Sequence, residues 1–229
     1  MIHKYSMNGL HIVLDVNSGA VHIVDKVVYD VLDFYKDCSF EEICEKLGDS
    51  YSEQELKEAC IEIEQLEKDI AAKNQALQEM PYDLLRDKDG LNLRAYQLKA
   101  IQAAENAIIN GQQNVLLAMA TGTGKTRTIL GMIYRFLKTG RFRRILFLVD
   151  RTSLGEQATD VFKEVKLEDL MTLDDIYNIK GLEDKTIDKE TRIQIATVQS
   201  MVKRILYNEE ETMPAVTDFD LVIIDEAHR

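Results

Sequence analysis

The sequence is poor in the residues that build disulfide scaffolds and rigid loops: 229 residues contain three cysteines, two prolines and no tryptophan. The cysteines are odd in number and form no C-x-x-C pair, so neither a disulfide framework nor a tetrahedral metal site is predicted, and we expect buried apolar cysteines. No window approaches about eighteen uncharged apolar residues, and the N-terminus has no apolar stretch of signal-peptide length. We therefore expect a cytoplasmic protein without a membrane partner. The cysteines are Cys38, Cys44 and Cys60.

Positive charge is scarce in the first third of the chain. The whole sequence carries 28 basic and 40 acidic residues, a net charge of -12. Residues 1–79 contain 7 basic and 17 acidic residues, a net charge of −10 (7 − 17). Residues 80–229 contain the other 21 basic and 23 acidic residues, a net charge of −2 (21 − 23). The acidic N-terminal region disfavours a DNA-binding winged helix there, because it repels phosphate.

Residues 1–66 are predicted to form a small α+β unit. Two β-branched runs, 10–14 and 20–24, flank a turn-rich link and predict a hairpin. Apolar residues at helical spacing over 27–35 and again over 40–47, the latter behind a capping Ser39, predict two short helices. A hairpin with short helices indicates a winged-helix-like domain.

A long helix follows, beginning at Ser52 and ending at Pro81. Glu55 completes a capping box with Ser52, and proline cannot continue the helix. Two interpretations stay open: a short coiled coil, or a long helix that packs on its own domain. Residues 67–90 are read as helix and linker. The heptad positions are Leu56, Ile63, Ile70 and Leu77, with Ala59, Leu66, Lys73 and Met80 three residues after each.

Residues 91–229 are predicted to form a second domain of the α/β class. Apolar runs at 115–119, 145–149, 193–197 and 221–224 alternate with segments of helical periodicity. Such alternation is typical of a parallel sheet covered by helices.

The segment MATGTGKT (Met119–Thr126) lies between the first of these runs and a helix-forming stretch. Gly122 and Gly124 would let backbone N–H groups wrap around phosphate oxygens, Lys125 would reach the β and γ phosphates, and Thr126 would ligate Mg²⁺. Met119 stands where the strict phosphate-loop pattern has glycine. The alternative is a chance glycine-rich turn.

The segment LVIIDEAH (Leu221–His228) places two acids at the end of a predicted strand. Asp225 would hold Mg²⁺, and Glu226 would polarise the attacking water. The alternative is a solvated turn. The predicted catalytic residues are Lys125, Asp225 and Glu226, with Thr126 and Asp225 as metal ligands and ATP and Mg²⁺ as cofactors.

MATGTGKT and DEAH together resemble the first motor lobe of superfamily-two helicases and translocases, a RecA-like fold. LRAYQ (93–97) resembles an upstream element of these motors. RRILFLVDRTSLGEQA (143–158) and IATVQSM (195–201) resemble the restriction subunit of type I restriction-modification enzymes. The resemblance implies an ATP hydrolase that translocates double-stranded DNA and assembles with methylation and specificity subunits.

The same resemblance implies roles for further residues. Gln97 would read the adenine edge; the alternative is a plain amphipathic helix start. Four further residues would contact DNA phosphates. The alternative is that each is an ordinary packed or solvated side chain. The implied nucleotide-binding residues are Gln97, Thr121, Gly122, Thr123, Gly124, Lys125 and Thr126, and the implied DNA-binding residues are Arg151, Thr152, Thr197 and Gln199.

A basic run, formed by Arg135, Lys138, Arg141, Arg143 and Arg144, follows the predicted phosphate-loop helix. It is read either as a phosphate track or as a solvated helix end whose charges complement the helix dipole.

Residues 1–66 carry a second resemblance, on MIHKYSMNG and LDVNSGAVHIVD, to the peptide-recognition domain of radical-SAM maturases of six-cysteine peptides. It implies capture of a leader-like peptide at an edge strand by β-augmentation. A faint nuclease pattern at Asp49 and Glu55–Lys57 is read as a capping turn, so no nuclease is predicted. His3, His11 and His22 show no ligand spacing.

The sequence ends at Arg229 without motifs of a second motor lobe. We therefore expect an incomplete lobe that binds ATP–Mg²⁺ better than it hydrolyses it. The alternative function is a peptide-binding module fused to a non-functional motor fragment.

Overall fold

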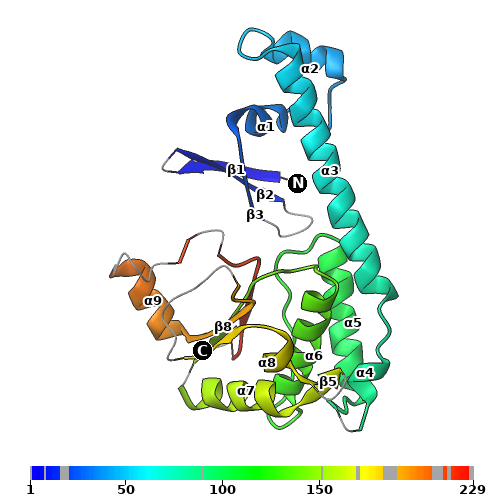
Figure 1. Cartoon of the computed structure of the whole chain (residues 1–229), viewed down its shortest axis with the longest axis vertical. Coiled ribbons are helices and arrows are strands. Elements are labelled where there is room, and N and C mark those ends of the chain that lie inside the picture. Colours follow the sequence, from blue (N-terminus) through cyan, green and yellow to red (C-terminus); the bar gives the residue numbers. More distant parts are fainter. Residues whose placement is uncertain are drawn as a thin grey trace. The chain divides into compact units, whose positions relative to one another are not determined.

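The computed structural model describes residues 2–7, 9–15, 21–88, 90–150, 152–168, 171–182, 190–207, 214–215 and 218–226 (Figure 1). The chain divides into two compact units. The first comprises Met1–Gln75 with Ile108–Gln113, and the second comprises Ala76–Ala107 with Asn114–Arg229. Within the described residues, no helix combines the length and apolar character needed to cross a membrane.

The first unit opens with an antiparallel sheet of three strands in the order β1-β2-β3. The predicted hairpin is confirmed: His11 to Leu14 pair with Val24 to Val21. The first strand was not predicted, because its polar and apolar residues do not form a recognisable run. The strands are β1 (Ile2–Met7), β2 (Leu10–Asp15) and β3 (Val21–Val24).

Three helices follow the sheet: α1 (Lys26–Val31), α2 (Phe40–Leu47) and α3 (Glu53–Glu79). Asp25 caps α1 through Val28 N at 2.9 Å, and Ser39 forms a capping box with Glu42. The second helix has the predicted limits, whereas α1 ends at Val31 and the chain continues in turns. The core of the unit contains Val13, Val24, Val28, Val31, Ile43, Leu56, Ala59 and Ile63.

The long helix α3 is confirmed at both ends. Ser52 and Glu55 form the predicted capping box, with Ser52 N donating to Glu55 Oε2 at 2.8 Å and Glu55 N donating to Ser52 Oγ at 3.3 Å. Heptad residues are buried within their own units: Leu56 in the core of the first unit and Leu77 near the end of the helix. These burials favour the intramolecular interpretation of the heptad stripe.

The second unit is built on a parallel four-stranded sheet in the order β7-β8-β4-β9. This is the α/β pattern predicted for a partial RecA-like lobe. Three of the four predicted apolar runs coincide with strands. The strands are β4 (Ile145–Val149), β7 (Ile179–Lys180), β8 (Ile193–Thr197) and β9 (Leu221–Ile224), beside a small pair, β5 (Lys166–Glu168) and β6 (Met171–Thr172).

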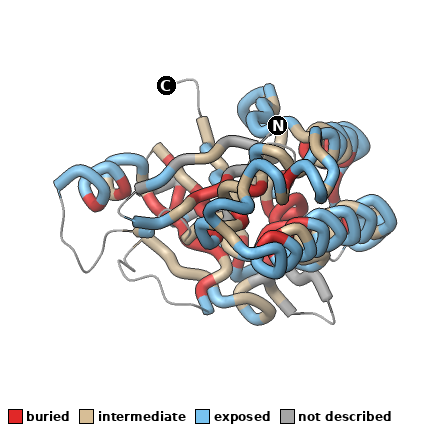
Figure 2. The backbone as a smooth tube through the Cα atoms, turned by 90° about the horizontal axis from the view of Figure 1, so that it is seen from above, coloured by how far each residue is buried: buried red, intermediate tan, exposed pale blue. Residues whose placement is uncertain are grey.

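Helices lie against this sheet, as the alternating pattern predicted. Phe147 of β4 meets Phe162 of α7 with ring centroids 6.2 Å apart, and Met201 of α9 packs with Leu146 and Ala196. Figure 2 shows α9 with both buried and exposed residues along its length. The helices are α4 (Asp83–Arg86), α5 (Ala95–Ile109), α6 (Lys125–Lys138), α7 (Thr152–Glu164), α8 (Leu173–Ile176) and α9 (Val198–Leu206).

The strand predicted at 115–119 is wrong. Residues 114–120 are described without regular structure, and the side chain of Leu116 is 83% exposed. An apolar run forms a strand only where a neighbouring strand supplies backbone partners, and no described strand pairs with this segment. The predicted phosphate loop therefore follows an irregular segment in this structure.

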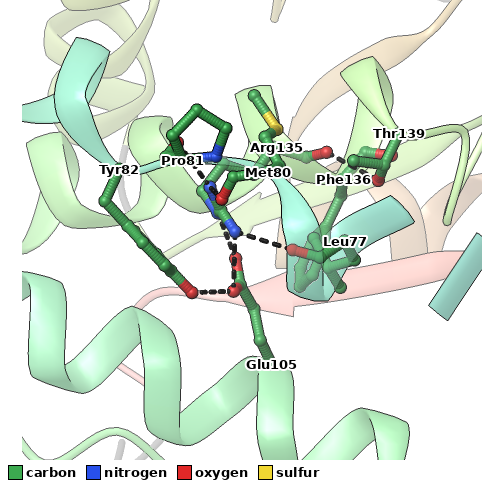
Figure 3. A network of polar contacts seen from close by, with 8 residues as sticks. All are labelled: Leu77, Met80, Pro81, Tyr82, Glu105, Arg135, Phe136 and Thr139. Atoms are coloured by element: carbon green, nitrogen blue, oxygen red, sulfur yellow. Dashed lines mark hydrogen bonds and ion pairs between the residues drawn. The ribbon is translucent and has the colours of Figure 1, made fainter. Parts of the chain in front are cut away.

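Arg135 fits neither interpretation of the basic run, the phosphate track or the solvated helix end. Arg135 lies on α6 and is fully buried, and all five of its N–H donors have acceptors (Figure 3). Nε and Nη2 donate to the Glu105 carboxylate at 2.6 and 3.2 Å, Nη1 donates to the carbonyls of Met80 and Pro81 at 2.9 and 3.0 Å, and Nη2 donates to the carbonyl of Leu77 at 2.9 Å. The guanidinium therefore caps the end of α3 and joins it to α5 and α6.

Two other arginines of the run also contact neighbouring side chains. Arg141 is buried, its guanidinium 4.5 Å from the Phe142 ring centroid, and Arg144 Nη1 lies 3.3 Å from Asp218 Oδ1. Arg143 is exposed. Neither a continuous phosphate track nor a wholly solvated helix end describes these residues.

Candidate nucleotide-binding site

The predicted phosphate loop, Met119–Thr126, continues into the first turn of α6. Gly124 is the N-cap of this helix with φ 79° and ψ 38°, and Gly122 has φ 78°. Both are left-handed conformations that glycine adopts without the steric cost of a Cβ atom. The first N–H groups of a helix have no partner within it, and the helix dipole is positive at this end. The loop and helix start thus have the backbone form of an anion-binding site.

The two acids predicted to complete the site lie at the end of β9. Asp225 N donates to the carbonyl of Leu148 at 2.9 Å, which continues the pairing of β9 with β4 by one residue. Glu226 N donates to Asp225 Oδ1 at 3.0 Å, and Glu226 itself has φ 55°. A left-handed conformation in a residue with a Cβ atom is strained, and such strain is frequent at functional sites.

The structure brings the two motifs together. Lys125 Nζ lies 3.8 Å from Glu226 Oε1, and both side chains are only partly exposed. Residues separated by a hundred positions in the sequence therefore meet at the carboxyl end of a parallel strand, where α/β proteins bind ligands. Thr126 in the first turn of α6 and Asp225 provide a hydroxyl and a carboxylate, oxygen donors of the kind that Mg²⁺ prefers.

The Gln97 side chain holds the loop through hydrogen bonds. Its side chain is 4% exposed, its Oε1 accepts from Arg94 N at 2.8 Å, and its Nε2 donates to Gly124 O at 3.1 Å and to Thr128 Oγ1 at 3.0 Å. The alternative of a plain amphipathic helix start does not account for these contacts. An adenine contact by Gln97 stays a prediction.

Two residues that touch the loop were missed by the sequence reasoning. The hydroxyl of Tyr96 donates to the carbonyl of Thr123 at 2.8 Å, and Thr128 Oγ1 donates to the carbonyl of Gly124 at 3.0 Å. Thr123 Oγ1 also donates to Ala120 O at 2.6 Å. Tyr96 is adjacent to Gln97 and Thr128 lies one helical turn beyond Gly124, so sequence proximity to the loop was the available signal.

The predicted DNA contacts are only partly described. Thr197 is the N-cap of α9, its Oγ1 accepting from Ser200 N at 3.1 Å, and Gln199 is exposed in the first turn of the same helix. Arg151 and the side chain of Thr152 lie outside the described residues. The four DNA contacts stay predictions.

That the cysteines and histidines have no metal role stays a prediction. The described residues contain no group of three His, Cys, Asp or Glu side chains that could hold a metal ion. The cysteines Cys38, Cys44 and Cys60 pack against the core of the first unit, and burial raises the pKa of the Cys60 thiol. A neutral thiol is a poor nucleophile and ligand.

Comparison with known proteins places the second unit in context. A family model described as type III restriction enzyme, res subunit, matches residues 90–229. A type I restriction enzyme EcoKI endonuclease subunit from Escherichia coli K12 is 53% identical over 139 residues, which cover 61% of this chain and 12% of that protein.

Two further relatives match segments of similar length. The type I restriction enzyme EcoAI endonuclease subunit of Escherichia coli is 37% identical over 147 residues, 64% of this chain and 17% of that protein. A putative ATP-dependent helicase, IRC3, of Saccharomyces cerevisiae is 31% identical over 142 residues, 59% of this chain and 19% of that protein. The matched segment thus spans less than a fifth of each relative.

Proposed function

Because this chain belongs to the family described as type III restriction enzyme, res subunit, we propose that its helicase-like motor lobe binds ATP and Mg²⁺ and serves a DNA translocase of the type I restriction class. The observation that carries the proposal is the 3.8 Å approach of Lys125 to Glu226. That approach brings the predicted phosphate loop next to the acidic residues at the end of β9. A site for a nucleoside triphosphate requires both parts.

The residues of the chain fit the group they are proposed to hold. The loop from Thr121 to Gly124 and the start of α6 would surround the phosphates, Lys125 would neutralise their charge, and Thr126 and Asp225 would hold Mg²⁺. The metal ion would supply charge neutralisation at the phosphates. Glu226 would orient the water, and its present partner Lys125 would turn to the phosphates instead.

The experiment is a titration of the whole chain with ATP in the presence and absence of Mg²⁺. We expect Lys125→Ala to abolish Mg²⁺-dependent binding, because removing the charge leaves the phosphates without their principal cation. Lys99→Ala, which removes an exposed lysine of α5, is the matched control and should bind as the wild type does. Equal affinity of wild type and Lys125→Ala would refute the proposal.

ATP hydrolysis requires a residue that ATP binding does not, Glu226. Glu226→Gln should retain ATP binding and lose hydrolysis, since the amide keeps the shape of the side chain and cannot accept the proton of water. We propose that the chain alone turns ATP over slowly. Phosphate release measured for both proteins under saturating ATP tests this; equal release would contradict the role of Glu226.

We further propose that the lobe contacts the backbone of double-stranded DNA and works with methylation and specificity subunits. Thr197 and Gln199 at the start of α9 would meet phosphates, together with Arg151 and Thr152. Gln199→Glu should weaken binding of a duplex oligonucleotide similarly for every sequence, because phosphate contacts carry no base information. Fluorescence anisotropy with two unrelated duplexes measures it, and sequence-dependent losses would contradict it.

A second function, peptide binding by residues 1–66, is supported by the order of the first sheet. The strand β3 lies at one edge and pairs with β2; no other described strand pairs with it. The exposed side chain of Ile23 lies on this strand. An edge strand can add an extended peptide through its backbone, and the acidic unit would favour a basic one.

A synthetic peptide of alternating valine and lysine residues tests this second function on the whole chain. We expect it to shift the amide resonances of Val21 to Val24. The same peptide with N-methylated backbone amides keeps the charge and the side chains and should not bind. Equal shifts with both peptides would reveal charge attraction alone and would contradict β-augmentation.

A further inference from the structure

The first turn of α5 holds two consecutive carbonyl groups of the phosphate loop. The hydroxyl of Tyr96 donates to Thr123 O at 2.8 Å, and Nε2 of the neighbouring Gln97 donates to Gly124 O at 3.1 Å. The second carbonyl also accepts from Thr128 Oγ1 at 3.0 Å. Two adjacent residues of α5 thus hydrogen-bond to two consecutive carbonyl groups of the loop.

A held carbonyl fixes the direction of the N–H group in the same peptide. The peptide unit is planar and trans, so the N–H of each residue points away from the carbonyl of the residue before it. Fixing Thr123 O therefore aims the N–H of Gly124, and fixing Gly124 O aims the N–H of Lys125. These are amides of the kind that phosphate loops direct at phosphate oxygens.

Gly124 needs such fixing more than an ordinary residue does. Its φ of 79° lies in a region open to glycine, and glycine has the largest backbone freedom of all residues. Without external hydrogen bonds, the two peptides beside it can rotate at little cost. Gln97 is buried, whereas Tyr96 is 43% exposed, so the Tyr96 hydrogen bond is the more exposed of the two.

We propose that Tyr96 is a positioning residue of the nucleotide site, whose hydroxyl holds the Thr123 carbonyl so that the Gly124 N–H stays aimed at the bound phosphate. The inference rests on the proposed ATP-binding function. Tyr96 acts through the loop and touches neither the base nor the phosphate. Its effect must therefore be the same for a nucleotide and for a phosphate chain without a base.

The test compares Tyr96→Phe with wild type in the full chain, using ATP–Mg²⁺ and inorganic tripolyphosphate–Mg²⁺ as probes in calorimetric titrations. We expect the loss of the hydroxyl to weaken both ligands by the same factor, about threefold to tenfold, the range of one hydrogen bond. Tyr82→Phe is the matched control. It also removes a phenolic hydroxyl that donates within the second unit, to Glu105, and should change neither affinity.

Amide exchange without any ligand gives a readout that is independent of ATP binding. In Tyr96→Phe the Gly124 amide should exchange faster than in wild type, whereas Tyr82→Phe should leave it unchanged. If the wild type bound neither probe, the proposed function would fail, and the exchange rates would still decide whether the hydroxyl fixes the loop.

Two results would overturn the inference. One is a Tyr96→Phe variant with wild-type affinities and wild-type exchange at Gly124. The other is a wild-type-like Tyr96→Phe together with a Tyr96→Ala variant that loses ATP and keeps tripolyphosphate. That pattern would mean that the ring stacks on the base and that the hydroxyl is unimportant.

Discussion

At the scale of single residues, the predicted phosphate loop depends on backbone conformations that only some side chains tolerate. Gly122 and Gly124 both have left-handed φ values, which glycine adopts without the steric cost of a Cβ atom. The two differ in their surroundings. A Cβ atom on Gly124 would lie 2.8 Å from Gln97 Nε2, whereas one on Gly122 would meet nothing within 4 Å.

This difference predicts unequal effects of alanine at the two glycines. Gly122→Ala should cost about 1–2 kcal/mol of unfolding free energy, the price of a left-handed alanine. Gly124→Ala should cost more, because the new methyl group also displaces the Gln97 amide from Gly124 O. Urea unfolding of both variants measures the difference. Equal losses would mean that Gln97 moves away freely and does not brace the loop.

At the scale of helices, the Arg135 network links three elements through one buried cation. Arg135 donates to the end of α3, to Glu105 on α5 and stacks 3.7 Å from the Tyr82 ring centroid. Burial and the Glu105 carboxylate raise the pKa of Tyr82, so its hydroxyl stays a donor throughout the neutral range. Glu105 and Arg135 each lie ten residues after the first residue of their helix, so the network joins α5 and α6 far from the ends that lie beside the predicted phosphate loop.

Arg135→Met should lower the unfolding free energy by about 3–5 kcal/mol, because it leaves Glu105 as a buried charge without its cation. The double variant Arg135→Met with Glu105→Met should recover part of that loss, since it removes the stranded charge as well. Urea unfolding of the single and double variants gives their unfolding free energies, which form a double-mutant cycle. A double variant no more stable than Arg135→Met would show that the carbonyl contacts dominate.

The capping box of α3 predicts a pH dependence. Hydrogen bonds from the side chain and backbone of Ser52 lower the pKa of Glu55 below its ordinary value. A carboxyl group with a lowered pKa stabilises the folded state above its unfolded pKa, and this stabilisation is lost as the pH falls through the folded value.

Acid titration of unfolding in wild type and Glu55→Gln measures this contribution. The glutamine keeps an acceptor for Ser52 and does not titrate. We expect the stability of the two proteins to differ at neutral pH and to converge at pH values below the lowered pKa of Glu55. Curves that stay parallel throughout the acid range would contradict the assignment.

At the scale of the whole molecule, the sequence predicted elements more reliably than their pairing. The runs that became β4, β8 and β9 and the helices α2 and α3 were found in the sequence, because apolar periodicity and capping are local signals. The run at 115–119 was misread since strand formation depends on a distant partner. The burial of Arg135 and the hydrogen bond from Tyr96 to the Thr123 carbonyl also depend on residues far away in the chain. A local sequence pattern carries no information about such contacts.

The surface of the whole molecule combines strong negative charge with an apolar stripe on α9. Val202, Ile205, Leu206 and Tyr207 are exposed, Leu206 by 67%, while Met201 and Arg204 of the same helix are buried. Contiguous exposed apolar side chains favour association, whereas a net charge of -12 opposes it through repulsion between copies.

These opposing terms predict association that grows with salt. Added salt shortens the Debye length to about 3 Å at 1 M, which screens the repulsion and leaves the apolar attraction intact. Sedimentation velocity at low and high salt should therefore show larger species at high salt, and Leu206→Gln should suppress them without changing the charge. Ile61→Gln removes an exposed apolar side chain from α3 instead and should associate as the wild type does. If both variants behaved alike, or if salt dispersed the larger species, charge pairing rather than the α9 stripe would be the cause.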